Sequence, residues 1–67
     1  MAVATLIEIT ASSTKSFEDA IERSIKRADK TLKNVRRAWL KDQEVIIDKG
    51  KVTKYRVTMN VSSVLKA

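Results

Sequence analysis

The sequence contains neither cysteine nor histidine, and this absence limits how so short a chain can reach a stable fold. A small domain buries only about 60% of its unfolded surface, and most such domains add disulfides, a structural metal or association. Without Cys or His, disulfides and tetrahedral zinc sites are excluded. We therefore predict a single domain, residues 1–67, that is stabilised by association with further copies of itself.

The same absences exclude most enzyme classes. Ser-His-Asp triads, Cys-His nucleophiles and imidazole bases all need histidine, and a lone glycine cannot make a Walker loop or a G-x-G-x-x-G turn. Ser12, Ser13, Ser62 and Ser63 have lysines nearby but no other base, and a lysine is not a base near neutral pH unless it is buried. We predict a protein without catalytic activity and without catalytic residues.

Composition and hydropathy place the chain among globular proteins. With 43% hydrophobic and 33% charged residues it is not disordered, and it has no apolar run near the length of a membrane span. Met1 is followed by no basic segment and apolar stretch of the kind that forms a signal peptide. These features predict a cytoplasmic protein that does not enter the membrane.

The net charge of +6 is unevenly distributed. Residues 1–29 carry four basic and five acidic side chains, whereas residues 30–67 carry ten basic and three acidic ones. Such asymmetry suggests an anionic partner, such as a nucleic acid, a phosphorylated metabolite or a lipid surface. A solvated, solubilising surface explains the same charge equally well.

The first half of the chain predicts a strand and a helix. Residues 3–10 are rich in Val, Ile and Thr, as strands are, and residues 11–14 form a polar loop. Ser16, three residues before Asp19, predicts the N-terminal cap of a helix that ends near Asn34. Apolar and small residues recur at three- and four-residue steps in this helix and form one stripe: Phe17, Ala20, Ile21, Ser24, Ile25, Ala28, Leu32 and Val35.

The second half predicts a β-hairpin. Residues 37–47 read as a strand that is bent or bulged at residues 41–44, where the apolar pattern is interrupted. Gly50 stands where a three-residue hairpin loop needs a left-handed residue. Beyond it, residues 55–65 alternate between apolar and polar side chains, the clearest strand pattern in the chain.

These elements predict an α+β fold with the order β-α-β-β. A right-handed crossover makes the first two strands parallel, and the hairpin returns the third strand, so an antiparallel sheet requires the order 1-3-2 with the helix on one face. One helix cannot cover the long second and third strands. We therefore expect apolar side chains near the C-terminus, such as Val61, Val64 and Leu65, to find partners on another copy.

Residues along nearly the whole chain resemble those of a known family. They are Leu6-Ile7-Glu8-Ile9, Phe17, Ala20-Ile21, Ala28, Lys30-Thr31-Leu32-Lys33-Asn34-Val35, Asp42-Gln43, Gly50, Tyr55, Val57-Thr58-Met59 and Val61. In this order and spacing the chain resembles the dodecins, small β-α-β-β proteins that assemble as hollow homododecamers and bind flavins. The resemblance implies that the assembly binds a small anionic or aromatic ligand, such as a flavin, and serves in ligand binding or storage.

The chain departs from this family at two ligand positions. In flavin-binding dodecins a Trp after the helix stacks on the isoalloxazine ring, and here that position is Arg37. The Gln that binds the pyrimidine edge is Arg56, which follows Tyr55. We therefore expect Arg37 and Arg56 to mark a degenerate flavin site that favours an anionic planar ligand, FMN rather than riboflavin, unless both arginines are merely solvated or ion-paired.

Three further interpretations stay open. Trp39 lies two residues beyond the family's Trp position, so we expect it to pack in the core or an interface. Asp42, Glu44 and Asp48 could offer oxygen ligands to Ca²⁺, but ion pairing fits them better among so many basic residues, and we predict no metal site. The alternative function is a basic β-α-β-β nucleic-acid-binding module that would use the polar face of the third strand: Arg56, Thr58, Asn60 and Ser62.

Overall fold

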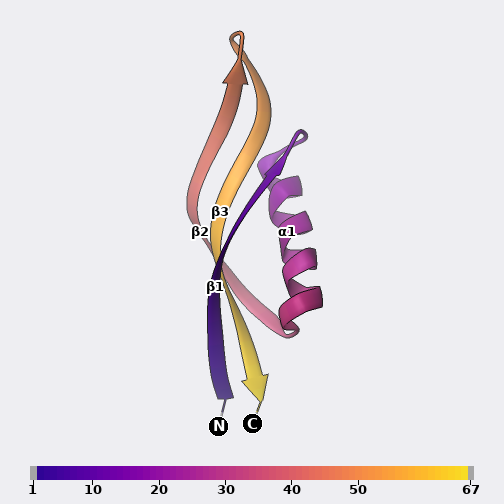
Figure 1. Ribbon diagram of the computed structural model, residues 1–67, viewed down its shortest axis with the longest axis vertical. Coiled ribbons are helices and arrows are strands. Elements are labelled where there is room, and N and C mark those ends of the chain that lie inside the picture. The colour runs from indigo at the N-terminus through magenta and orange to yellow at the C-terminus, as the bar shows by residue number, and fades with distance from the viewer. Residues whose placement is uncertain (1, 67) are drawn as a thin grey trace.

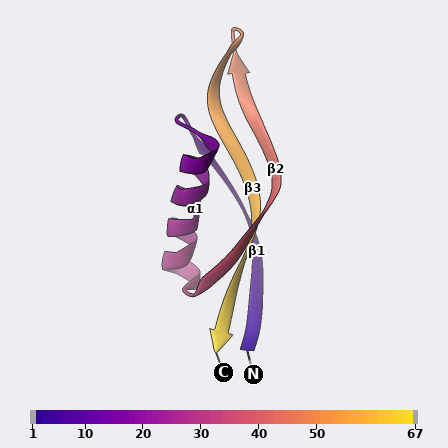
Figure 2. The same cartoon turned by 180° about the vertical axis from the view of Figure 1, so that it is seen from behind.

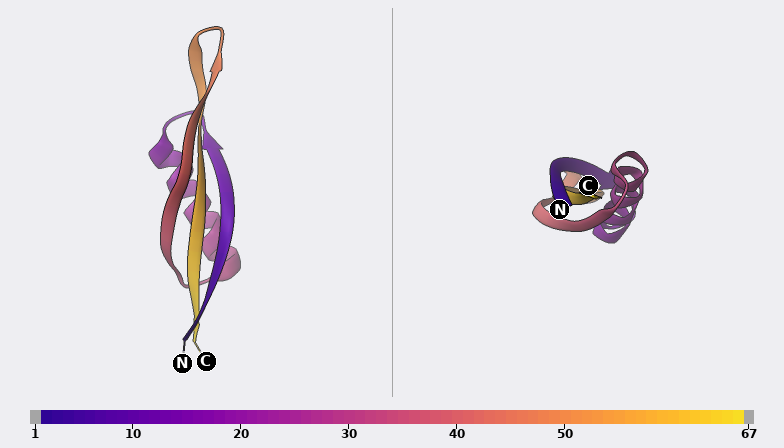
Figure 3. Two further views of the ribbon diagram at one scale, coloured as in Figure 1. Left: turned by 90° about the vertical axis from the view of Figure 1, so that its left-hand side faces the viewer. Right: turned by 90° about the horizontal axis from the view of Figure 1, so that it is seen from below.

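The structure is a computed structural model that describes residues 2–66 as three strands and one helix. They follow in the order β1 (Ala2–Ser13), α1 (Phe17–Leu32), β2 (Val35–Asp48) and β3 (Lys51–Lys66). The strands form one antiparallel sheet in the order β1-β3-β2, and α1 lies along one of its faces (Figure 1; Figure 3). The predicted fold class and strand order are confirmed.

β1 is longer than its sequence pattern predicts. Residues 11–14 read as a loop, but Ala11, Ser12 and Ser13 pair with β3, opposite Val57, Arg56 and Tyr55. A polar segment becomes strand here because β3 extends far enough to take up its backbone hydrogen bonds. The loop is therefore confined to residues 14–16.

The helix begins where its capping residue predicts. Ser16 has an extended backbone, and its hydroxyl accepts a hydrogen bond from the backbone N–H of Asp19 at 3.0 Å. At the other end, Lys33 and Asn34 both have positive φ, 58° and 51°. This turns the chain out of the helix, which ends two residues before the predicted stop at Asn34.

The core is formed by small side chains of α1 and larger ones of β3. Ala20 and Ala28 pack against Val57, Met59 and Val61, all of them buried. Because Ala side chains are small, α1 can approach the sheet closely enough to exclude water from these three β3 side chains. The expectation that Val61 needs a partner on another copy is wrong: Val61 is 0% exposed in the single chain because α1 covers it. Val64 is half-buried, and Leu65 is not among the residues whose side chains the structure describes.

The predicted irregularity in β2 is a bulge. The register shifts between Leu40 and Asp42, which pair with Met59 and Thr58, so Lys41 has no partner in β3. Its ammonium group instead reaches Glu8 of β1, with Nζ 2.8 Å from Oε1. The hydrogen bond to Glu8 and its negative charge raise the pKa of Lys41. The bulge thus redirects one side chain across the central strand.

The β2–β3 hairpin has a two-residue loop. Asp48 pairs with Lys51, which leaves Lys49 and Gly50 as the loop, with φ of 52° and 76°. Two successive positive φ values are typical of a type I′ turn, whose twist matches that of the strands. The predicted left-handed Gly50 is confirmed, but the three-residue loop is wrong because Lys49 also adopts the left-handed conformation.

Replacing Gly50 by Val should destabilise the hairpin through its backbone alone. No atom lies within 4 Å of a Cβ built at Gly50, so a clash plays no part. A left-handed residue that is not glycine costs about 1–2 kcal/mol, and a β-branched one tolerates it least. We expect Gly50→Val to lower the free energy of unfolding by at least that amount in chemical denaturation. Gly50→Asn, which accepts positive φ, should lose much less; equal losses would contradict the turn assignment.

A carboxylate joins the β1–α1 loop to the first turn of the helix. The Ser13 hydroxyl donates to Oδ2 of Asp19 at 2.6 Å and accepts from the backbone N–H of Lys15 at 2.9 Å. Nε of Arg23 lies 3.1 Å from the same Oδ2 atom. The Ser13 hydrogen bond, ahead of the charges of Arg23 and Lys15, lowers the pKa of Asp19.

Asp19 should therefore stabilise the fold in a defined pH range. Since the pKa of Asp19 is lower in the folded chain than in the unfolded one, its contribution is complete above about pH 5 and is lost as the pH falls through the unfolded and then the folded value. We expect Asp19→Asn to melt several degrees below the native protein at pH 7 and to converge with it near pH 2. Glu18→Gln, in the same helical turn, serves as control. A melting difference for Asp19→Asn that does not depend on pH would contradict this role.

The fold is elongated because the hairpin extends past the helix. The principal extents are 52 × 18 × 13 Å and the radius of gyration is 13.8 Å, whereas a compact chain of this length has roughly 11 Å. Figure 1 and Figure 2 show the β2–β3 hairpin rising beyond the N-terminal end of α1, while both chain ends lie together at the opposite end. Several large apolar side chains are exposed in the single chain, some on this extension and others on the sheet face turned away from α1: Leu6, Trp39, Leu40, Val45, Ile47 and Val52.

Candidate functional site

The face of the sheet that is turned away from α1 carries both predicted ligand residues. Directly paired residues of antiparallel strands share a face, so the register assigns the side chains. Arg37 lies beside Ser62, and Arg56 lies between Ser12 and Glu44. We call this surface the outer sheet face; on β3 it includes Lys54, Arg56, Thr58, Asn60 and Ser62.

The two arginines lie far apart on this face. The partner of Arg37 on β3 is Ser62, six residues along the strand from Arg56. At about 3.3 Å per residue this separation is close to 20 Å. One chain therefore does not bring Arg37 and Arg56 together around a single small ligand.

The two arginines also differ in their partners. Nη1 of Arg56 lies 3.1 Å from Oε1 of Glu44, its neighbour on β2, and both side chains are about half exposed. An exposed pair of this kind is weak, and the guanidinium keeps further N–H groups for a ligand. Arg37 makes no ion pair with any side chain that the structure describes. Arg37 is thus the more available cation on the outer sheet face.

Trp39 lies on the outer sheet face and not in the core. It pairs with Asn60, one row along from Arg37 and Ser62, and 48% of its surface is exposed. We expected Trp39 to pack either in the core or in an interface, and its exposure in the single chain excludes the core. A half-exposed indole beside a free guanidinium provides an aromatic surface next to a positive charge.

Charges on the outer sheet face nearly cancel. Asp42 and Glu44 share this face, as expected, and lie opposite Thr58 and Arg56. Together with Glu8 they offset all but one of the positive side chains of the same area: Arg37, Lys41, Lys54 and Arg56. Within residues 2–66 no three His, Cys, Asp or Glu side chains gather closely enough to hold a metal ion. The basic surplus of the chain therefore lies elsewhere.

Two features that the fold assembles were not predicted from the sequence. One is the Glu8–Lys41 contact, which joins residues 33 apart and depends on the bulge in β2. The other is an open groove between α1 and β1, with Arg23 and Arg27 on its helical side. The small residues Ser24 and Ala28 in the apolar stripe were the only sequence signal for the groove.

No described helix is both long and apolar enough to span a bilayer.

Known proteins share both the sequence pattern and the fold. The dodecin family model matches residues 3–66. A mutant of the T. thermophilus dodecin is 27% identical, with each chain fully covered (100%) and a TM-score of 0.91. The Streptomyces davaonensis dodecin matches in fold, with 24% identity, 98% of this chain and 97% of that chain covered, and a TM-score of 0.91.

A further relative is described as a calcium-binding protein. The calcium dodecin of Mycobacterium tuberculosis, a calcium-chelating antigen with a novel calcium-binding site, is 29% identical over 96% of this chain and 91% of that chain, with a TM-score of 0.82. A comparison with curated proteins gave no match. Since the family match spans nearly the whole chain and the strand order agrees with it, the chain belongs to the dodecins, a family of small oligomeric flavin-binding proteins without enzymatic activity.

Proposed function

We propose that this protein is a non-enzymatic, dodecameric shell that binds and stores a small planar anion, with FMN or another nucleotide bound in preference to riboflavin. The binding site lies between copies of the chain, on the outer sheet face. The observation that carries this proposal is the set of apolar side chains that a single chain leaves exposed.

The exposed residues lie where another copy can cover them. Leu6 and Ile47 are each 62% exposed, at opposite ends of the sheet, and Trp39 lies between them. The helix cannot reach Leu6 or Trp39, because it lies on the other face of the sheet, and it ends short of the hairpin that carries Ile47 (Figure 3). Burying apolar area contributes about 25 cal/mol per Å². Association with further copies would therefore supply stability that the small core of a single chain does not.

A twofold arrangement of two copies can complete the ligand site. Arg37 and Arg56 lie about 20 Å apart along β3, so one chain cannot use both. If two outer sheet faces meet with their β3 strands antiparallel, Arg37 of one copy lies opposite Arg56 of the other. By symmetry, Arg56 of the first copy then lies opposite Arg37 of the second, so this arrangement supports two equivalent ligand sites at each such axis.

The residues on this face favour an anion with a planar group. A guanidinium can stack on a ring and can also bind a phosphate through two parallel hydrogen bonds. It is a donor only, so it cannot replace an amide that both donates to and accepts from the pyrimidine edge. The phosphate of FMN can therefore form charged hydrogen bonds with a guanidinium, whereas riboflavin has no phosphate to form them.

The alternative of nucleic-acid binding gains no support from the outer sheet face. Arg56 is paired with Glu44, and the Thr58 and Thr10 hydroxyls lie within hydrogen-bond distance of each other. The nearly balanced charge of this face offers little attraction for a phosphate backbone. Trp39 is the only aromatic side chain on it, whereas single-strand binding uses several.

Native mass spectrometry and flavin titration test the proposal together. We expect a mass of twelve chains, and quenching of flavin fluorescence that is stronger for FMN than for riboflavin. The preference for FMN should shrink as salt rises, because it depends on a charged contact. A monomer or dimer would overturn the shell, and tight riboflavin binding would overturn the degenerate site.

A further inference from the structure

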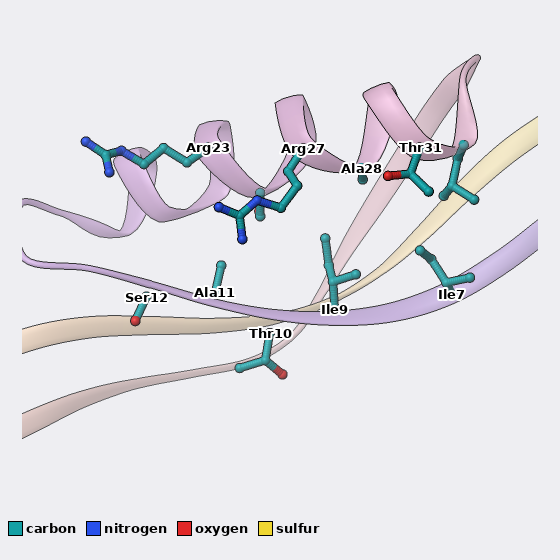
Figure 4. A pocket seen from close by; sticks show the side chains of 11 residues that line it. Ile7, Ile9, Thr10, Ala11, Ser12, Arg23, Arg27, Ala28 and Thr31 are labelled. Atoms are coloured by element: carbon teal, nitrogen blue, oxygen red, sulfur yellow. The ribbon is translucent and has the colours of Figure 1, made fainter.

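A groove lies between α1 and the edge strand β1, on the opposite side of the sheet from the proposed flavin site. It encloses about 610 Å³ and is open on one side, a volume within the usual 300–1,000 Å³ range of ligand sites. Figure 4 shows Ile7, Ile9 and Ala11 pointing from β1 toward the helix, while Thr10 and Ser12 point away. The floor of the groove is therefore apolar.

The groove exists because the side of α1 nearest β1 carries small residues. Ser24 and Ala28 line it, whereas the larger Ile21 and Ile25 pack against the core. β1 is an edge strand, with β3 on one side only. Within residues 2–66 no further strand closes the groove from outside, so in the single chain it stays accessible along β1.

One cation reaches over this groove without a partner. Figure 4 shows the Arg27 side chain extending from α1 toward β1, above Ala11 and Ile9. Arg27 forms no ion pair with the side chains that the structure describes. Arg23, one turn earlier, is instead bound to Asp19. Arg27 is thus the group placed to meet an anion in the groove.

The helix does not neutralise this positive charge. Arg23, Lys26, Arg27 and Lys30 border a second, shallow hollow beside the groove. At 100° per residue the acidic side chains Glu18, Glu22 and Asp29 fall on the opposite flank of α1. The flank next to β1 therefore keeps a positive potential, and an anion is the complementary charge.

We propose that the groove between α1 and β1 binds a small amphiphilic carboxylate, whose apolar chain lies on Ile7, Ile9 and Ala28 and whose head group binds Arg27. The apolar floor accommodates the hydrocarbon chain, and the guanidinium can hold a carboxylate through two parallel hydrogen bonds. This site is separate from the one on the outer sheet face, so both ligands can bind to one assembly.

Calorimetric titration of the intact assembly with decanoate tests the site. We expect saturable binding that weakens at least tenfold in Arg27→Gln, a loss of about 1.4 kcal/mol or more. Lys51→Gln, which removes a cation from the distant hairpin, is the matched control and should leave the affinity unchanged. Decanol, with the chain but no charge, and acetate, with the charge but no chain, should each bind more weakly. Saturating FMN should not alter decanoate binding.

Three results would overturn the proposal. The first is an absence of saturable decanoate binding, and the second is equal affinity of the native protein and Arg27→Gln. The third is competition between decanoate and FMN, which would place decanoate on the outer sheet face instead. If decanoate does not bind the native protein and the assembly mass changes in Arg27→Gln, a second copy occupies the groove.

Discussion

Trp39→Glu is expected to break the assembly into smaller species. Trp39 leaves 48% of its surface uncovered in the single chain, and a Trp can bury 150–250 Å². At about 25 cal/mol per Å², covering the exposed half contributes roughly 2–3 kcal/mol per copy, and a buried carboxylate would add a further cost. Because every copy of a symmetric assembly carries the change, its effect is multiplied.

Size-exclusion chromatography with light scattering measures this effect. We expect the Trp39→Glu protein to elute as a species of much lower mass than the native protein, and to melt at a lower temperature. Thr14→Glu is the matched control, since it introduces the same charge in the exposed loop between β1 and α1. A Trp39→Glu protein that keeps its full mass would show that the outer sheet face is not an interface.

Arg37→Trp combined with Arg56→Gln is expected to create riboflavin binding. The Trp restores an aromatic surface that contributes about 0.5–1.5 kcal/mol beyond its buried area. The Gln restores a group that both donates and accepts hydrogen bonds, with a further contribution of about 1 kcal/mol. Together these predict a gain in riboflavin affinity on the order of 30-fold.

Fluorescence quenching measures this gain, with each single variant and with the double variant. Since Arg37 and Arg56 lie about 20 Å apart in one chain, a gain larger than the sum of the two single effects would indicate that they meet across two copies. Arg36→Gln, at a neighbouring position of β2, removes a cation without restoring either group and should add nothing. A double variant that gains no affinity would mean that these positions do not line the flavin site.

Local patterns predicted the elements and their order. Ser16 was recognised as the helix cap because its hydroxyl serves a backbone group only three residues away. Gly50 was recognised as left-handed because the turn depends on its own backbone. The alternation in residues 55–65 predicted which side of β3 is apolar, and Val57 and Met59 are buried accordingly. Each of these features depends on residues close in sequence.

Site geometry was less predictable, because it depends on register and on packing between distant segments. The sequence identified Arg37 and Arg56 and placed them on strands, but only the pairing of β2 with β3 shows that one chain keeps them apart. The bulge was expected, but the Lys41 contact with Glu8 requires β1 and β2 to flank β3.

The sequence by itself determined the β-α-β-β order, the helix cap, the left-handed glycine and the apolar face of β3, since backbone preference and side-chain periodicity act over a few residues. The tertiary structure alone decided that α1 covers Val61, that β1 continues to Ser13, and that a groove opens beneath Arg27. The burial of Val61 and the groove depend on how closely α1 approaches the sheet, and that distance is set by the bulk of side chains far apart in the chain. The extension of β1 depends on pairing with β3, which is equally distant in sequence.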